Sequence, residues 1–451
     1  MYSRITASFL PAAALARLAA AISICVAFCG CGLVYKNSIR RDGFVVYTND
    51  GPEFLEKTSD RIEKIYASLS DVFEIPRPFP WTTRIFLDGR ADGILDYSYN
   101  PDLLGYYVPF LQIIRIDSRA AASNLVSDLN QVLLHEIAHH FLVSELPGIS
   151  GKCWLNEGLA GNLEVGIIDE DRAEFPLLNP VLLRIAQKEL AANSDRELLR
   201  DLLRSSWKAF HDKNTREKNY ALSWAIVYHL LEKELPAGMP LKARINRIHA
   251  MGEEAITDLE NRWRNNILGL NVVEKLGALA NDSAPGKKLT AIWAIHELGK
   301  SRGFNIRRSL VILENLFDDE ALEIREASYV SFLDLLSNNP QMPFLEPEKT
   351  GEALTRLQSI IADREANPRL RARLVENLDH HRTLKKDWIP LLIETLEDSR
   401  PVVRAAAAGA LSKMAAKPTI ISPVFWANAS IEERSVEVGE WKRWLAARQP
   451  R

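Results

Sequence analysis

Two histidines and a glutamate stand at a spacing that suits metal-assisted hydrolysis. His135 and His139 are four residues apart in the string HEIAH, and Glu136 follows the first histidine. Residues four apart lie on one face of a helix, so both imidazoles can bind one metal ion while Glu136 points beside them toward a bound water. We therefore expect a hydrolytic zinc site with Glu136 as its general base.

A third metal ligand is expected in the next apolar segment. Glu157 stands in the string WLNEGLA, in a second amphipathic segment that can fold back beside the first. A set of two histidines and one glutamate leaves the fourth zinc position to water, whereas structural zinc sites are commonly closed by four Cys or His ligands. We expect one Zn²⁺ per chain, bound by His135, His139 and Glu157, with a water of lowered pKa.

The two strings together resemble a known group of enzymes. HEIAH followed by WLNEGLA is similar to the catalytic core of the gluzincin metallopeptidases, and the second string is close to that of the gluzincin aminopeptidases. The Gly-x-Met-Glu-Asn segment that binds a free amino terminus in those aminopeptidases is absent from this sequence, which argues against an exopeptidase. The sequence more closely resembles the bacterial peptidase MA-like domains of exported proteins. This resemblance implies a zincin-like fold and a peptide or protein substrate.

The resemblance also implies a donor for the oxygen that gains negative charge during hydrolysis. The related families carry a tyrosine at the start of a helix after the glutamate ligand, and Tyr220 stands at that place. Tyr228 and His211 are the alternatives, although Tyr228 lies among apolar residues and is more typical of a core aromatic. We interpret His229 as a surface histidine.

Three side chains near the motifs have other interpretations. His140 projects about 100° around the helix from its neighbour His139, so it cannot join the same metal ion, and it is interpreted as a satisfied or metal-supporting histidine. Asp128 shares a helix face with His135 and either orients that imidazole or is a solvated charge. Cys153 is interpreted as a buried, inert thiol rather than a ligand.

The sequence pattern before the metal motif indicates both strands and helices. Its apolar runs predict strands at 44–48, 84–88 and 112–117. The helical period predicts an amphipathic helix over 51–73 and a largely buried helix, carrying HEIAH, over 124–143. By the resemblance, strand 112–117 is the sheet edge, where an extended peptide would bind by main-chain pairing.

The first residues are typical of an export leader. Two arginines precede an apolar run at 18–28, which is shorter than a usual membrane span and ends in the string CGC. Gly30-Cys31 resembles a bacterial lipoprotein cleavage site, so we expect residues 1–31 to be the leader and Cys31 to carry the lipid that anchors the protein to a membrane. A plain signal peptide or an uncleaved anchor are the alternatives. Each places the protein outside the cytoplasm, and cleavage without lipidation predicts a secreted or periplasmic protein.

The composition is typical of a folded protein with several domains. The 451 residues are 47% hydrophobic and 25% charged, which suffices for large cores. We predict an α+β chain: a zincin-like metallopeptidase domain at 32–270, an all-α, HEAT-like solenoid at 271–417 and a helical cap at 418–451. A net charge of −3 gives no support for a nucleic-acid partner.

The region after residue 271 repeats a local pattern. An acidic residue is followed six positions later by a basic residue and then by an apolar helix. Four pairs share this spacing: Asp282 with Lys288, Asp319 with Arg325, Glu365 with Arg371, and Asp398 with Arg404. The pattern resembles HEAT repeats, whose stacked helix pairs form surfaces for protein partners. The weaker pairs are equally consistent with an ordinary helical bundle.

Two classes of function follow from these observations. The first is an exported zinc peptidase whose repeats recruit or position a substrate. The second is a catalytically silent or gated protein that keeps the peptidase fold and binds partners through its repeats. Glu136 favours the enzyme, because a protein that has lost catalysis usually lacks a metal ligand or the general base.

Overall fold

The chain folds into two compact units. The computed structural model describes residues 35–76, 79–88, 105–117, 126–168, 173–175, 178–194, 197–300, 304, 306–338, 347–378, 385–415 and 422–448. The first unit, here called the sheet unit, comprises Met1–Leu178 and Asn193–Arg264. The second, here called the helical unit, comprises Asn179–Ala192 and Asn265–Arg451.

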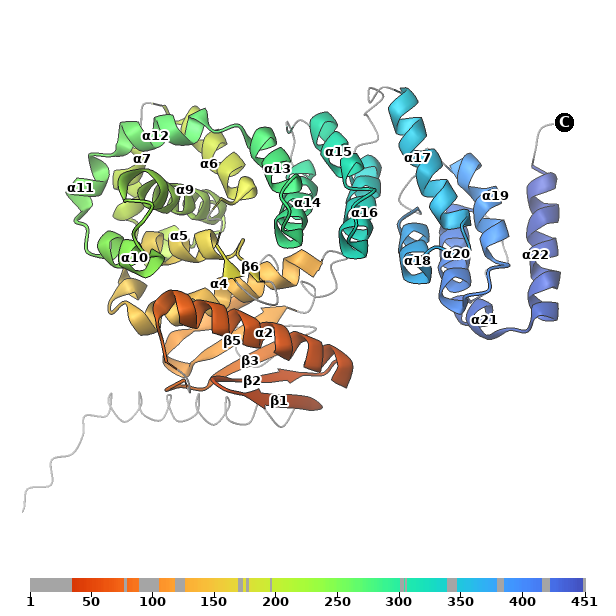
Figure 1. The fold of residues 1–451 in the computed structure, drawn as a ribbon, viewed down its shortest axis with the longest axis horizontal. Coiled ribbons are helices and arrows are strands. Elements are labelled where there is room, and N and C mark those ends of the chain that lie inside the picture. Colours follow the sequence, from red (N-terminus) through yellow and green to blue (C-terminus); the bar gives the residue numbers. More distant parts are fainter. Residues whose placement is uncertain are drawn as a thin grey trace, which may run out of the picture. The chain divides into compact units, whose positions relative to one another are not determined.

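A mixed sheet forms the base of the sheet unit (Figure 1). In spatial order, the five strands found among the described residues are β1 (Asn37–Arg41), β2 (Phe44–Thr48), β3 (Thr83–Asp88), β5 (Ile113–Asp117) and β4 (Gly105–Val108). The three central strands run parallel, and β1 and β4 pair antiparallel at the two edges. A two-stranded hairpin, β6 (Ile167–Ile168) with β7 (Ala173–Glu174), lies apart from this sheet.

Helices α2 (Pro52–Phe73) and α4 (Val126–Glu145) cover one face of the sheet. Because side chains alternate along a strand, every second residue of the central strands points to this face. The register places Val46, Ile85 and Ile114 side by side there, and all three are fully buried. At the edge, Tyr107 of β4 reaches α4, where its hydroxyl lies 3.0 Å from His140 Nδ1. Helix α4 is thereby held against the sheet.

Further helices complete the described part of the sheet unit. They are η2 (Pro109–Leu111), η3 (Ile149–Gly151), α5 (Cys153–Leu163), α7 (Leu198–Leu203), α8 (Trp207–Phe210), α9 (Arg216–His229), the π-helix η4 (Leu230–Glu234), α10 (Leu241–His249) and α11 (Glu253–Thr257). Helix α5 packs on both α4 and α9. A Cβ atom at Gly158 would lie 2.5 Å from the Ser223 carbonyl oxygen, so α5 and α9 approach to backbone contact there.

Helix pairs in succession make up the helical unit (Figure 1). The pairs are α13 (Val272–Ala280) with α14 (Pro285–Gly299), α15 (Ile306–Asn315) with α16 (Leu322–Asn338), α17 (Pro347–Ala362) with α18 (Pro368–Asn377), and α19 (Lys385–Thr395) with α20 (Pro401–Met414). The second helices pack in series, α14 on α16, α16 on α18, and α18 on α20. The last described helices, α21 (Pro423–Asn428) and α22 (Ile431–Ala446), pack on α20 and α19.

The turns that carry the acidic residues of the sequence pattern bind the preceding helix pair. Asp319 accepts a hydrogen bond from Lys288 at 2.5 Å, and Asp398 forms an ion pair with Arg371 at 2.6 Å. Two of the basic residues also bind the carbonyl of their own turn: Arg325 donates to the Asp319 carbonyl at 2.5 Å, and Arg404 donates to the Asp398 carbonyl at 2.9 Å. The six-residue spacing therefore reflects a turn that links successive repeats.

The third repeat differs from its sequence interpretation. Its turn acceptor is Asp363, whose Oδ1 accepts from the Glu365 N–H at 3.0 Å. Arg371 caps the Ile361 carbonyl, with Nη2 at 2.7 Å.

One helix of the helical unit comes from within the sequence of the sheet unit. Helix α6 (Pro180–Ala192) packs on α13 and α14 through Leu183, Ala186 and Leu190, each fully buried. The sequence prediction of a continuous metallopeptidase domain over 32–270 did not separate this helix. The connecting helix α12 (Glu260–Gly269) contains the third boundary between the units, after Arg264.

Several other predictions are corrected or fall beyond the described residues. Strand 112–117, which corresponds to β5, was predicted as the sheet edge, but β4 pairs on its outer side and is the edge. Residues 1–31 and Cys31 lie outside the described part of the chain, as does the side chain of Asp128. Across the described residues, no helix has both the length and the apolar character needed to span a membrane.

Candidate metal centre

Helices α4 and α5 bring the three predicted ligands together. Ligand atoms of His135, His139 and Glu157 all lie within 4.8 Å of one another. The two Nε2 atoms are 3.1 Å apart, and each is 3.3 Å from Glu157 Oε2. His139 and Glu157 are buried, so the cluster faces the interior of the sheet unit rather than open solvent.

The spacing of these atoms fits a tetrahedral metal ion. Two ligands about 2.0–2.2 Å from zinc in tetrahedral geometry are about 3.3–3.6 Å apart, close to the separations seen here. Glu157 Oε2 is buried and has no hydrogen-bond partner among the described residues. A buried carboxylate oxygen in that state is costly unless a cation or donor is supplied. The donor set of two imidazoles and one carboxylate suits Zn²⁺.

A fourth residue, which is acidic, supports the first proposed ligand. Glu164 follows the end of α5, and its Oε2 lies 2.7 Å from His135 Nδ1. Such a carboxylate fixes the tautomer and orientation of a metal-binding imidazole. Burial alone would lower the pKa of His135, but the adjacent carboxylates of Glu157 and Glu164 raise it well above its usual value. The sequence analysis missed Glu164, although its place two helical turns after Glu157 was a usable signal.

The proposed general base is buried beside the ligands. Burial raises the pKa of Glu136 above its usual value, while the nearby imidazoles of His135 and His139 oppose this rise. Its Cγ atom lies next to β4, because a Cβ atom built on Gly105 would stand 3.0 Å from it. Because Gly105 has no side chain, β4 can pass close to Glu136 at this point.

Tyr220 lies on α9 and His211 lies on the loop before it, and both are close to the proposed ligands. The Tyr220 ring is stacked near His135, with centroids 6.5 Å apart. Its hydroxyl lies 3.1 Å from His211 Nδ1, and His211 Nε2 lies 4.0 Å from Glu157 Oε1. Burial raises the pKa of Tyr220, with Glu157 and Glu136 contributing further, so the phenol keeps its proton. Both residues named as donors thus lie at the metal cluster.

The other residues singled out in the sequence serve the fold. His140 is buried between Thr83 and Tyr107, and burial lowers its pKa to about 3, so it is a neutral histidine that joins α4 to the sheet. Tyr228 is buried and stacks on Trp224, with centroids 5.2 Å apart. Cys153 is only partly buried and is not among the clustered ligands.

The prediction that His229 lies on the surface is wrong. Its exposed fraction is 2%, and its Nε2 lies 3.1 Å from Glu234 Oε1 in the π-helix. The last two turns of α9 are buried on all sides, so the polar side chain at their end is enclosed with them.

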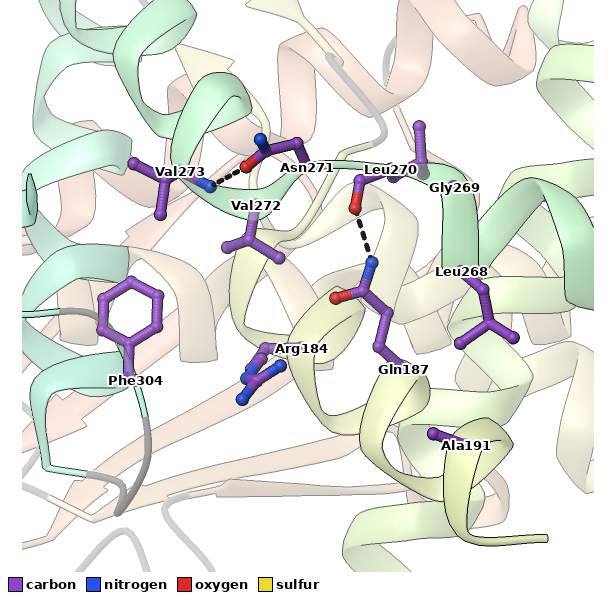
Figure 2. A pocket seen from close by; sticks show the side chains of 10 residues that line it. All are labelled: Arg184, Gln187, Ala191, Leu268, Gly269, Leu270, Asn271, Val272, Val273 and Phe304. Atoms are coloured by element: carbon purple, nitrogen blue, oxygen red, sulfur yellow. Dashed lines mark hydrogen bonds between the residues drawn. The ribbon is translucent and has the colours of Figure 1, made fainter. Parts of the chain in front are cut away.

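A separate pocket in the helical unit contains none of these groups. It lies where α12 meets α13, against α6, and has a volume of about 560 Å³ (Figure 2). Gln187 spans one wall and donates to the Leu270 carbonyl at 2.6 Å, and Asn271 caps α13 by accepting from the Val273 N–H at 3.1 Å. Its lining holds aliphatic side chains and one arginine, but no acid, histidine or cysteine. It does not provide hydrolytic chemistry.

Comparison with known proteins identifies the repeats. The family model of HEAT repeats matches residues 355–422, which include α18, α19 and α20. The chain therefore carries HEAT-like helical repeats in this region. The searches of curated proteins and of solved structures each gave no match.

Proposed function

We propose that the sheet unit is a zinc-dependent metallopeptidase of the gluzincin type that hydrolyses peptide bonds. The observation that carries this proposal is the buried triangle of His135 Nε2, His139 Nε2 and Glu157 Oε2, with sides of 3.1, 3.3 and 3.3 Å. The buried carboxyl of Glu136 adjoins it on the same helix. This set leaves one coordination position open for water, as catalytic zinc sites do.

The chain's own residues supply the acid-base and electrostatic parts of hydrolysis. A zinc ion bound by the three ligands would lower the pKa of its water to about 7 and polarise the substrate carbonyl. Glu136 takes the proton of the attacking water and delivers it to the leaving amine. Its raised pKa brings it closer to neutral pH, where it can perform both transfers. Tyr220 donates a hydrogen bond to the carbonyl oxygen as that oxygen gains negative charge.

The proposed substrate is an extended peptide or protein segment. Among the described residues, no strand pairs with the outer side of β4, and this strand passes Glu136 at Gly105. By analogy with related enzymes, a substrate strand would pair with this edge and place one peptide bond at the metal. In this proposal the binding edge is β4, which pairs with β5 over four residues, instead of β5 itself.

We further propose that the protein acts outside the cytoplasm, as a lipoprotein anchored through Cys31. The support is the sequence alone: an apolar run at 18–28 followed by Gly30-Cys31. A secreted or periplasmic form is the alternative.

The second candidate function is a scaffold that binds protein partners without cleavage. HEAT repeats favour this class, because stacked helix pairs present extended surfaces for other proteins. The two functions are compatible if the repeats present a partner or substrate to the site. They differ in whether Glu136 is needed.

Metal content and hydrolysis, measured together, test the proposal. The protein from Gly32 onward and its Glu136→Gln variant are analysed for zinc and incubated with a mixed library of unstructured peptides. One zinc per chain in both, with cleavage only by the unmodified protein, supports a peptidase. Zinc in both without cleavage favours the scaffold, and absence of stoichiometric zinc contradicts the site assignment.

A further inference from the structure

His211 makes two contacts at the site that the proposed mechanism leaves without a role. Its Nδ1 lies 3.1 Å from the Tyr220 hydroxyl, and its Nε2 lies 4.0 Å from Glu157 Oε1. It is outside the group of three residues whose ligand atoms cluster. The imidazole therefore stands between the proposed donor and a proposed ligand without belonging to the metal set.

The loop that carries His211 is fastened on both sides. The buried Asn219 of α9 donates from its side chain to the Phe210 carbonyl at 2.9 Å, immediately before His211. The Thr215 hydroxyl donates to the Ala209 carbonyl at 3.0 Å. The Trp207 ring also contacts the imidazole, with centroids 4.7 Å apart. These contacts hold the His211 imidazole in place, unlike the side chain of a freely rotating surface residue.

A tyrosine hydroxyl has one proton to donate and lone pairs to accept with. If Tyr220 donated its proton to His211, the substrate oxygen would find no donor there. If His211 instead donates from Nδ1, the hydroxyl oxygen is the acceptor and the phenol proton stays free. A neutral imidazole has one nitrogen as donor and the other as acceptor, so the Nδ1–H tautomer of His211 can make this hydrogen bond.

We propose that His211 is a positioning residue: its Nδ1–H donates to the Tyr220 hydroxyl oxygen and directs the phenol proton toward the substrate carbonyl oxygen. This inference rests on the proposed peptidase function and deepens it. His211 touches neither substrate nor metal in this role. A hydrogen bond already made to the phenol oxygen also removes the cost of orienting Tyr220 during the reaction.

The kinetic test compares substitutions at both positions in the zinc-loaded protein. Removing an oxyanion donor typically costs about 10²–10³ in kcat, so Tyr220→Phe is expected to lose that much with little change in KM. His211→Leu should lower kcat by about tenfold or more, and adding it to Tyr220→Phe should cost little further, because both act through one hydrogen bond. His211→Asn keeps an amide donor near Nδ1 and should recover most of the loss. Tyr228→Phe and His249→Asn are the matched controls and should leave kcat unchanged.

A second readout does not depend on activity. Long-range ¹H–¹⁵N spectra of the metal-free protein, labelled at its 9 histidines, report the tautomer of each ring, with His211 assigned from the spectrum of His211→Asn. We expect the Nδ1–H tautomer at His211, and a changed Nδ1 shift in Tyr220→Phe but not in Tyr228→Phe.

The outcomes separate this inference from the proposed function. Cleavage by the unmodified protein with no kcat loss in His211→Leu, or an Nε2–H tautomer at His211, would overturn the positioning role and leave the peptidase intact. Loss of zinc in His211→Leu would make His211 a ligand and also overturn it. Failure of the unmodified, zinc-loaded protein to cleave would overturn the peptidase proposal, while the tautomer measurement would still report the hydrogen bond.

Discussion

At the scale of single residues, the proposed metal centre depends on a carboxylate outside the proposed ligand set. Glu164 holds His135 through Nδ1 at 2.7 Å, whereas Nδ1 of His139 is buried without a hydrogen-bond partner among the described residues. The two imidazoles are therefore supported unequally. The first ligand is oriented by a charged partner, and the second is oriented by the packing of α4 alone.

Glu164→Ala should weaken zinc binding by about 10–100-fold, because the ligand imidazole loses the carboxylate that fixes its tautomer and orientation. A chelator competition titration measures the affinity directly. Glu197→Ala is the control, since Glu197 is an exposed glutamate paired with Arg200 at the surface. Equal zinc affinity in Glu164→Ala and the unmodified protein would show that packing alone orients His135.

The local sequence predicts some residues of the candidate site but not others. His135, His139 and Glu157 follow from spacing within two helices, so their convergence could be predicted. The pairing of His211 with Tyr220 depends on how a loop folds back onto α9, which no local period encodes. For the same reason the sequence misplaced His229, whose burial results from the packing of α9 with its neighbours.

At the scale of elements, the site depends on how closely α5 and α9 approach. Gly158→Ala should lower the stability of the sheet unit by about 1–3 kcal/mol or more, because the new methyl group would meet the Ser223 backbone at 2.5 Å. Gly277→Ala, in a helix with open space at that position, should have the opposite sign and stabilise by about 0.5–1 kcal/mol. Thermal unfolding measured by calorimetry compares the two. A neutral Gly158→Ala would mean that α5 shifts freely against α9.

The acidic turns give the helical unit a pH-dependent contribution. Burial alone would raise the pKa of Asp319, but Lys288 and the Ala321 N–H lower it below its ordinary value of 3.8. A carboxyl whose pKa is lowered by folding stabilises the protein above pH 3.8, and this contribution is lost as the pH falls through the folded-state pKa. Asp319→Asn should therefore cost about 1–2 kcal/mol at pH 7 and progressively less below pH 4.

The control for Asp319→Asn is the adjacent variant Asp318→Asn. It removes the same charge from a side chain that is 78% exposed and paired with Arg356. A surface pair contributes about 0–1 kcal/mol, so little change is expected at any pH. Urea unfolding of both variants at several pH values measures the difference. A cost for Asp319→Asn that does not shrink in acid would assign its effect to packing instead of charge.

Elements with a strong period were predicted closely, and the edges of the sheet were not. The helix predicted over 51–73 is α2, Pro52–Phe73, because its apolar face repeats over six turns. Strand β1 has the sequence NSIRR, whose single apolar residue gives little alternation, and β4 has only four residues. Both edge strands form because a neighbouring strand supplies hydrogen bonds, which is a property of the sheet and not of the segment.

At the scale of the whole molecule, neither unit is one continuous stretch of the chain. The boundary predicted near residue 271 relied on a change of pattern along the chain, which is clear where the repeats begin. It could not show that α6 belongs with the repeats, because the amphipathic pattern of a helix indicates that one face is buried but not what covers it. Three chain connections, after Leu178, Ala192 and Arg264, therefore join the two units.

The membership of α6 predicts which helices lose protection when it is destabilised. Leu183→Ala removes a fully buried side chain and should cost about 2–5 kcal/mol, with faster amide hydrogen exchange in α13 and α14. Exchange in α5 and α9 should stay unchanged, and the zinc content with it. Leu199→Ala in α7, also fully buried but in the sheet unit, should give the reverse pattern because α7 packs on α9. If Leu183→Ala instead exposed α5 and α9, the first helix of the repeats would begin at α13 and α6 would be part of the proposed peptidase.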